Sequence, residues 1–376
     1  MPAAVPKDFF KEHCSFAEIK DEVIGNFLAD WCGILPPLPE TDDEQAILYI
    51  DLNSGAGLVP SGLATLPDNL LENLCQALSN NKGANALLRA FFADANKTVH
   101  ESIGEKLASL PCYDNLVHPP VALAEQVSQT MLAELQALGY PSLLLGDPFS
   151  SVLAQQVLQQ SLDAGNADLL LLFSPESMLK ALSAKKVSPA LASLFGERLV
   201  QIASFCKKEK NTRRRQQYIA EQLESILLER KLLTLTFKIN KPDADETAYY
   251  LLFSSQNKKA FKRFRELMLS YSDYHEDGVP MFTANHALQP QLSLFPQRRR
   301  YSVSLLAEDL ATSAGKYKFK SIEKISEDHS SGTPYIADNY LAAFEVLRVQ
   351  GKVEILNPKT LQAIRKPTLA SIIKYK

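Results

Sequence analysis

The sequence lacks the marks of several common protein classes. Its five cysteines are scattered and no two have C-x-x-C spacing, so it indicates neither a zinc knuckle nor a disulfide framework. None of its six histidines has H-x-x-x-H or H-E-x-x-H spacing and no G-x-S-x-G occurs, so we expect neither a metal site nor a hydrolase. Apolar runs such as Leu169 to Phe173 are too short to cross a bilayer, and the first residues do not resemble a signal peptide. We therefore expect a cytoplasmic protein.

The charge is distributed unevenly along the chain. The net charge is −3, but residues 296–376 hold 14 Lys and Arg against 8 Asp and Glu, whereas residues 1–295 hold 26 against 35. A basic end (+6) on an acidic body (−9) predicts that the C-terminal part meets nucleic acid or another polyanion. A solvated basic face is the alternative interpretation.

One segment near residue 50 predicts a ligand site. The run from Ala46 to Ile50 suits a buried parallel strand, and it is followed by Asp51 and a turn containing Gly55 and Gly57. Residues 62–78 then have the apolar pattern of a helix. A strand, a D-x-x-x-G-x-G turn and a helix are how nucleoside cofactors are held at the carboxyl edge of an α/β sheet. The acid before the turn is typical of the first motif of S-adenosylmethionine (SAM) methyltransferases, and a plain tight turn is the alternative.

The order of the expected elements predicts an α/β fold of the class I methyltransferase (Rossmann-like) type. An amphipathic helix over residues 8–35 comes first, and alternating strands and helices follow. Two strand-like runs separated by a short polar turn then predict an antiparallel hairpin, which is how class I methyltransferase sheets end. The expected strands cover 46–51, 87–93, 115–118, 142–147, 168–173, 232–239 and 248–254, and the expected helices cover 98–110, 121–138, 152–162, 175–182, 189–206, 212–230 and 257–269.

The chain is expected to divide into a large and a small domain. Three helices followed by a strand near the end suggest a winged helix-turn-helix, with Thr333 as N-cap and Pro334 as first residue of the third helix. The expected parts are an N-terminal helix and acidic loop (1–45), a methyltransferase-like domain (46–285) with a helical insert (175–231), a linker (286–297) and a winged helix (298–376).

Several motifs resemble those of the three-Cys-motif partner family. Residues 49–57 resemble its first motif, Y-I-D-x-F-A-G-x-G, with Asn53-Ser54 in place of Phe-Ala, and Asp147-Pro148-Phe149-Ser150 resembles its D-P-F-G box. The resemblance implies a bacterial methyltransferase-like protein with a winged helix, a protein partner that carries the cysteine motif, and a defence or phage-related setting. Three further positions match the family's first helix: His13, Lys20 and Trp31.

These patterns nominate the residues of a SAM site. Asp94 ends the second strand, where a carboxylate can accept from both ribose hydroxyls, although it lies 37 residues beyond Gly57 rather than about 20. Asp147 and Phe149 stand where amino-methylating enzymes hold the target amine and stack on its base, and a helix cap and a core residue are the alternatives. The residues expected to hold the cofactor are Asp51, Asn53, Gly55, Gly57 and Asp94.

Clusters of cations are the candidates for nucleic-acid contacts. One cluster joins two helices of the insert, one begins the helix after the hairpin, and the others lie in the C-terminal part. They comprise Arg213, Arg214, Arg215, Lys258, Lys259, Arg298, Arg299, Arg300, Lys316, Lys318, Lys320 and Lys352.

Two functions are compatible with the sequence. The first is SAM-dependent methyl transfer to nucleic acid, or a SAM-sensing role derived from it. The second is a catalytically inactive nucleic-acid-binding or scaffold subunit that works beside a partner enzyme, which the incomplete box at Asp147 favours.

Overall fold

The structure is a computed structural model that describes residues 6–34, 46–53, 68–94, 97–124, 138–184, 186–242, 244, 246–286, 301–330 and 332–376. The chain divides into two compact units, Met1–Ser270 and Tyr271–Lys376, each of which is described by itself. No helix within the described part of the chain is both long and apolar enough to cross a membrane.

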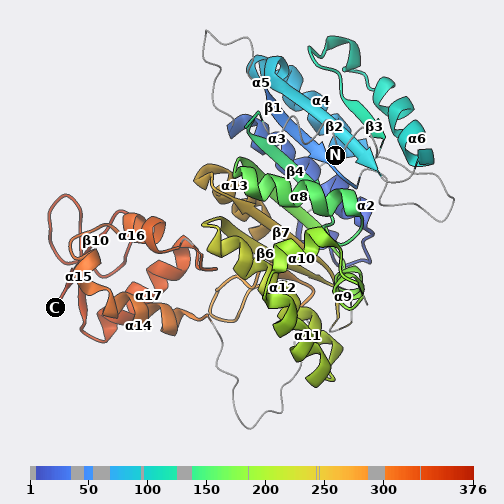
Figure 1. The fold of residues 1–376 in the computed structure, drawn as a ribbon. Coiled ribbons are helices and arrows are strands. Elements are labelled where there is room, and N and C mark those ends of the chain that lie inside the picture. The colour runs from blue at the N-terminus through green and yellow to red at the C-terminus, as the bar shows by residue number, and fades with distance from the viewer. Residues whose placement is uncertain are drawn as a thin grey trace. The chain divides into compact units, whose positions relative to one another are not determined.

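A mostly parallel sheet is the centre of the first unit (Figure 1). Its strands follow the spatial order β3-β2-β1-β4-β5-β7-β6. The pairings among β1 to β5 are parallel, whereas β7 is antiparallel to both β5 and β6. The predicted class I methyltransferase-like sheet with a terminal hairpin is therefore confirmed. The strands are β1 (Ile47–Asp51), β2 (Leu88–Asp94), β3 (Val121–Ala124), β4 (Ser142–Gly146), β5 (Ala167–Phe173), β6 (Leu233–Asn240) and β7 (Thr247–Ser255).

Helices cover both faces of this sheet (Figure 1). Every residue of β1 and β4 is buried, as expected for central parallel strands. On one face, Leu48 and Leu144 pack in a core that includes residues of α8 to α12. On the other, Phe27 of α3 contacts Phe253 of β7 and Phe264 of α13. The described helices are α1 (Pro6–Phe9), α2 (Phe16–Ile19), α3 (Gly25–Ile34), α4 (Asp68–Asn80), α5 (Lys82–Leu87), α6 (Lys97–Ala108), α8 (Val152–Ala164), α9 (Pro175–Leu182), α10 (Pro189–Phe195), α11 (Arg198–Lys208), α12 (Thr212–Glu229) and α13 (Lys258–Leu269).

The N-terminal segment is not the single helix that its apolar spacing predicted. It is interrupted after α1 and restarts at Ser15, whose side chain accepts from the backbone of Glu18 while Glu18 accepts from the backbone of Ser15. Such a reciprocal capping box fixes a helix start. Residues Lys20–Ile24 then form a π-helical turn between α2 and α3. Because a π-turn inserts an extra residue into the helix, it changes the direction in which the following side chains point.

Three other expected elements also differ from the structure. The third strand is Val121–Ala124 rather than residues 115–118, where a 3₁₀ turn, Tyr113–Asn115, lies instead. The helix predicted over 121–138 therefore does not begin at residue 121, and residues 125–137 lie outside the described part. The helix predicted over 189–206 is broken, because Gly196 has a φ of +52° and ends α10.

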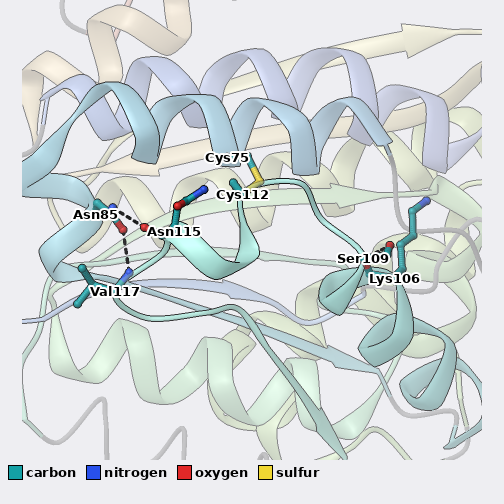
Figure 2. The surroundings of a disulfide bond; sticks show 7 residues. All are labelled: Cys75, Asn85, Lys106, Ser109, Cys112, Asn115 and Val117. Atoms are coloured by element: carbon teal, nitrogen blue, oxygen red, sulfur yellow. Dashed lines mark hydrogen bonds between the residues drawn. A yellow bond between two sulfur atoms is a disulfide. The ribbon is translucent and has the colours of Figure 1, made fainter.

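A disulfide bond joins Cys75 of α4 to Cys112, which lies 37 residues later in the segment leading to β3 (Figure 2). The same segment is held at its other end by Asn85, whose side chain donates to the Asn115 carbonyl (3.2 Å) and accepts from the Val117 amide (3.1 Å). The scattered cysteines were not expected to form disulfides, and the Cys75–Cys112 bond corrects that expectation. The cytoplasmic expectation rested partly on it.

The second unit has its own core of helices and a small antiparallel sheet. Tyr317, Tyr340 and Phe344 are among its buried residues. The third helix starts later than predicted, because Ile336 and not Thr333 is its N-cap. The elements are β8 (Thr283–Ala284), α14 (Val303–Thr312), α15 (Ala314–Tyr317), α16 (Ile322–His329), α17 (Ala337–Val349), β9 (Val353–Leu356) and β10 (Ile372–Tyr375), and β9 pairs with β10.

The boundary between the units lies before the predicted linker. Residues 271–285 were expected in the first domain, but Val279 is part of the core of the second unit. The Asn339 side chain donates to the Gly278 carbonyl (2.9 Å), and the Asp277 carboxylate accepts from the Val303 amide (2.9 Å). The three longer helices α14, α16 and α17, followed by a two-stranded sheet, agree with a winged helix, which stays a prediction.

Candidate cofactor and acceptor site

The sheet brings three of the predicted site residues to one edge. The strands β1, β2 and β4 are neighbours and parallel, so their carboxyl ends lie together. Asp51 ends β1, Asp94 ends β2, and Asp147 directly follows β4. The strand order reverses between β1 and β4, because β2 and β3 lie on one side of β1 and β4 and β5 on the other. Ligands of open α/β sheets bind in the crevice at such a reversal.

Asp51 is fully buried and paired with a lysine from the N-terminal segment. The Lys20 ammonium lies 2.5 Å from the Asp51 carboxylate and donates to the Asn53 carbonyl (3.0 Å), and both side chains have 0% exposure. Burial raises the pKa of Asp51, and the nearby Lys20 charge opposes that rise. A carboxylate enclosed in this way, together with Lys20, holds the backbone of Asn53 at the end of β1.

Asn53 links the end of β1 to the loop after β4. Its side-chain oxygen accepts from the Asp147 amide (2.9 Å), and its side-chain nitrogen donates to the Ser150 hydroxyl (2.9 Å). Its own amide donates to the Asp51 carboxylate (3.1 Å). The chain must come close here, since a Cβ on Gly146 would lie 3.3 Å from Leu52. Asn53, predicted as a cofactor ligand, therefore sets the distance between the two loops.

Asp147 is 7% exposed and has a raised pKa. One of its carboxylate oxygens accepts from the Phe149 amide (2.8 Å), and the other accepts from the Ser177 hydroxyl (3.4 Å). Burial raises its pKa to about 6, against the lowering influence of these two hydrogen bonds. The alternative role as a helix cap is wrong, because Ser151 caps α8 by accepting from the Ala154 amide (3.1 Å).

Phe149, predicted to stack on the target base, is buried in the core. Phe149 is 6% exposed, and its ring packs edge-on against Phe173 with 5.2 Å between centroids. No face of this ring is open to stack on a base, which fits the alternative that it is a core residue.

Gly55 and Gly57, which were predicted to hold the cofactor, lie outside the described residues.

Asp94 is the most accessible acid at this edge. It is half-buried, and it is close enough to Asp51 that its charge contributes to raising the pKa of that residue. Its position at the end of β2, beside β1, is where a carboxylate can accept from ribose hydroxyls. The structure thus places Asp94 and Asp147 on either side of the carboxyl end of β1.

The predicted cations lie on separate elements. Arg213 to Arg215 occupy the first turn of α12, and Arg214 lies 3.6 Å from Glu209. Lys258 and Lys259 begin α13 and are exposed. In the second unit, Lys316, Lys318 and Lys352 are exposed, Lys320 is partly buried, and Arg298 to Arg300 lie outside the described residues.

Sequence reasoning missed two features of the site. Lys20 had only been matched to a family position, and its pairing with Asp51 could not be foreseen from a separation of 31 residues. The exposed cations Lys359, Arg365 and Lys366 on the β9–β10 connection were also missed. The sequence could have predicted this basic segment, since residues 357–371 contain no Asp or Glu.

Neither a protein-family model nor a curated protein sequence matches this chain. Among solved structures, the DszA carbon methyltransferase aligns with 65% of this chain and 55% of its own, with 11% identity and a TM-score of 0.34. The methyltransferase domain of bacterial CtHen1-CN aligns with 63% of this chain and 100% of its own, with 10% identity and a TM-score of 0.31. The CurJ carbon methyltransferase aligns with 63% of this chain and 54% of its own, with 11% identity and a TM-score of 0.31. The alignment thus spans about half the length of each carbon methyltransferase. Scores this low add no argument to the strand order, which carries the fold assignment.

Proposed function

We propose that the carboxyl edge of the sheet binds SAM and that the protein transfers its methyl group to an amine of nucleic acid. The observation that carries the proposal is the convergence of Asp51, Asp94 and Asp147 at the point where the strand order reverses. A sheet of this layout ending in an antiparallel hairpin supports the same choice of cofactor.

The residues at this edge fit a cationic nucleoside cofactor. Asp94 is half-buried and ends a strand next to β1, so its carboxylate would hold the ribose hydroxyls. Asp51 and Asn53 would act by fixing the turn that follows β1, because both are buried and bonded to their surroundings. When bound, the cofactor would supply an electrophilic methyl group, and the two acids beside it would favour its positive charge.

Asp147 would hold and deprotonate the acceptor amine. A primary amine that gains a methyl group must lose a proton, and a carboxylate with a pKa near the working pH is suited to accept it. Burial raises the pKa of Asp147 to about 6, so the group is ionised at neutral pH and is a stronger base than an exposed carboxylate.

Nucleic acid is the acceptor that the charge pattern supports best. Exposed cations lie at the first turns of α12 and α13 in the first unit and along the second unit. Cations that contact phosphates release counterions, so binding should weaken as salt rises, with a slope of log affinity near −0.9 per contact on duplex DNA. Replacing Arg213 to Arg215 by Ala should flatten this slope by about 2 to 3.

A second candidate is a non-catalytic subunit that binds nucleic acid beside a partner protein. Two observations favour it. The Asp51 carboxylate is already paired with Lys20. The Phe149 ring packs against Phe173 in the core and is therefore not available to stack on an acceptor base. In this case, the edge of the sheet would have only a structural role, and the exposed cations would bind the nucleic acid.

Two conservative variants separate these candidates. Asp147→Asn should abolish transfer of a radiolabelled methyl group to nucleic acid but leave SAM affinity within about twofold, because the amide keeps the shape and loses the base. Asp94→Asn should weaken SAM binding by about tenfold or more, the size expected for losing a charged hydrogen bond. Transfer that survives in Asp147→Asn would refute its catalytic role, and unchanged SAM affinity in Asp94→Asn would refute the ribose contact.

A further inference from the structure

An aromatic side chain is displayed on the surface of the second unit in an unfavourable backbone conformation. Phe319 is 56% exposed and has a φ of +59°. Left-handed backbone is costly for residues other than glycine and persists where the surroundings enforce it. Here β10 enforces it, because the Phe319 amide donates to the Ile373 carbonyl (2.8 Å) and the Ile373 amide donates to the Lys320 carbonyl (3.0 Å). The fold therefore holds this ring outside its core.

One lysine lies over this ring, and two more lie over the ring of Tyr317 close by in the chain. The Lys318 ammonium lies 5.7 Å from the centroid of Phe319, and the ammonium groups of Lys316 and Lys320 lie 4.7 and 5.6 Å from the centroid of the buried Tyr317. Lys320 is partly neutralised by Asp328 at 3.5 Å. Lys316 and Lys318 form no ion pair with any carboxylate that the structure describes. The exposed Phe319 ring thus lies beside the Lys318 ammonium, with Lys316 nearby in the chain, on which the Asp328 charge also acts.

We propose that Phe319 is a stacking platform for an unpaired nucleotide base and that the second unit therefore binds single-stranded nucleic acid. Grooves that bind single strands combine cations along the backbone with aromatic side chains on which bases stack. Duplex DNA offers phosphates but no free base face, so an exposed ring would contribute nothing to its binding. The proposal rests on the nucleic-acid part of the proposed function and specifies the form of the ligand.

A membrane surface is a less suitable occupant. Anchoring to a membrane takes two signals, such as an inserted chain together with a polybasic patch. Phe319 is a single ring on a short connection between α15 and α16, and Asp328 of α16 partly offsets the charge of Lys316 and Lys320. The charge is therefore suited to a few phosphates of a flexible strand rather than to an extended anionic surface.

The test uses Phe319→Gly in the full chain. Glycine adopts a φ of +59° without strain, so this variant should unfold at the same temperature as the wild type or a higher one. Its affinity for a fluorescein-labelled 15-nucleotide oligothymidylate should nevertheless fall about 5- to 150-fold, the range for losing one stacked base. Phe319→Trp keeps an aromatic ring at this position and should bind the oligothymidylate as tightly as the wild type. Affinity unchanged in Phe319→Gly would overturn the proposal.

Leu361→Gly is the matched control. Leu361 is 60% exposed with a φ of +56°, so the change relieves the same strain and removes a similar apolar area without removing an aromatic ring. We expect its oligothymidylate affinity to equal that of the wild type, and an equal loss in both variants would refute stacking. Replacing Lys316 and Lys318 by Ala should lower the salt slope by about 1.4, because each phosphate contact on a single strand contributes about 0.7.

Two further ligands distinguish this proposal from the proposed function. A 15-base-pair duplex should bind more weakly than the single strand and should not respond to Phe319→Gly. A loss of duplex affinity in Phe319→Gly as large as the loss for the single strand would refute the stacking site and leave nucleic-acid methylation standing, whereas binding to vesicles of anionic phospholipid but to no oligonucleotide would refute both.

Discussion

The buried Lys20–Asp51 pair gives the sharpest stability prediction. Both side chains have 0% exposure, and the Lys20 ammonium also donates to the Asn53 carbonyl (3.0 Å). Replacing Lys20 by Met keeps the length and apolar stem of the side chain and removes the charge. Asp51 is then left in the interior with the Asn53 amide as a remaining hydrogen-bond donor. Removing one partner of a buried ion pair costs about 3 to 5 kcal/mol, because the other charge stays desolvated.

The double variant Lys20→Met with Asp51→Asn isolates the interaction. It leaves no uncompensated charge, so we expect it to recover at least about 2 kcal/mol relative to Lys20→Met alone. A matched control is Lys262→Met, which removes a lysine whose side chain is 72% exposed in a pairing with Glu266. Exposed pairs contribute about 0 to 1 kcal/mol, so the control should change the free energy of unfolding very little.

The loss in Lys20→Met should depend on pH in a defined direction. Burial raises the folded-state pKa of Asp51, and removing Lys20 removes the largest influence that opposes this rise. A raised folded-state pKa means that the folded state binds the proton more tightly, so stability falls as pH rises above the unfolded pKa, by about 1.4 kcal/mol per pH unit until the folded pKa is reached. The deficit relative to wild type should therefore be larger at pH 8 than at pH 5.

Urea unfolding followed by tryptophan fluorescence measures this directly. Trp31 is the only tryptophan of the chain, is 2% exposed, and donates to the Asp168 carboxylate (2.8 Å) within the first unit. Its emission thus reports the unit that contains the pair. A loss below about 1 kcal/mol in Lys20→Met, or an equal loss at pH 5 and pH 8, would refute the assignment of a buried pair.

Three further stability predictions follow from the structure. Replacing Cys75 and Cys112 by Ser should lower the free energy of unfolding by about 4 kcal/mol, since the bond closes a loop of 37 residues; Cys206→Ser is the control, and five free thiols rather than three in the denatured, non-reduced chain would contradict the bond. Gly351→Ala should destabilise the second unit by about 1 kcal/mol in calorimetry, because Gly351 has a φ of +72°, and no change would contradict the left-handed assignment. Gly33→Ala should stabilise α3 by about 0.5 kcal/mol in urea unfolding, because its Cβ would meet no atom within 4 Å, and a loss of stability would indicate an unseen clash.

The sequence predicted the sheet well because its central strands are simple. β1 and β4 are short buried strands with apolar centres, Asp51 ends β1 and Asp147 follows β4, and the two strands of the hairpin are separated by only a few polar residues. These local patterns also determine that Asp51 and Asp147 end at the same edge. The fold class and the candidate acids could therefore be derived without coordinates.

The errors arose where local chemistry or distant contacts override periodicity. The capping box at Ser15 and Glu18 was readable and would have divided the N-terminal helix. Val121 to Ala124 have helix-compatible spacing but pair with β2, which is a contact over about 30 residues. Contacts of long sequence separation also explain why the Lys20–Asp51 pair and the Cys75–Cys112 bond could not be predicted.

Titration calorimetry of the purified protein with SAM tests the central claim most directly. If the edge formed by β1, β2 and β4 is a cofactor site, SAM or its demethylated product should bind at micromolar strength with one site per chain, and Asp94→Asn should weaken this binding by about tenfold or more. No heat with either ligand at millimolar concentration would contradict the methyltransferase proposal and leave the chain as a nucleic-acid-binding or scaffold subunit.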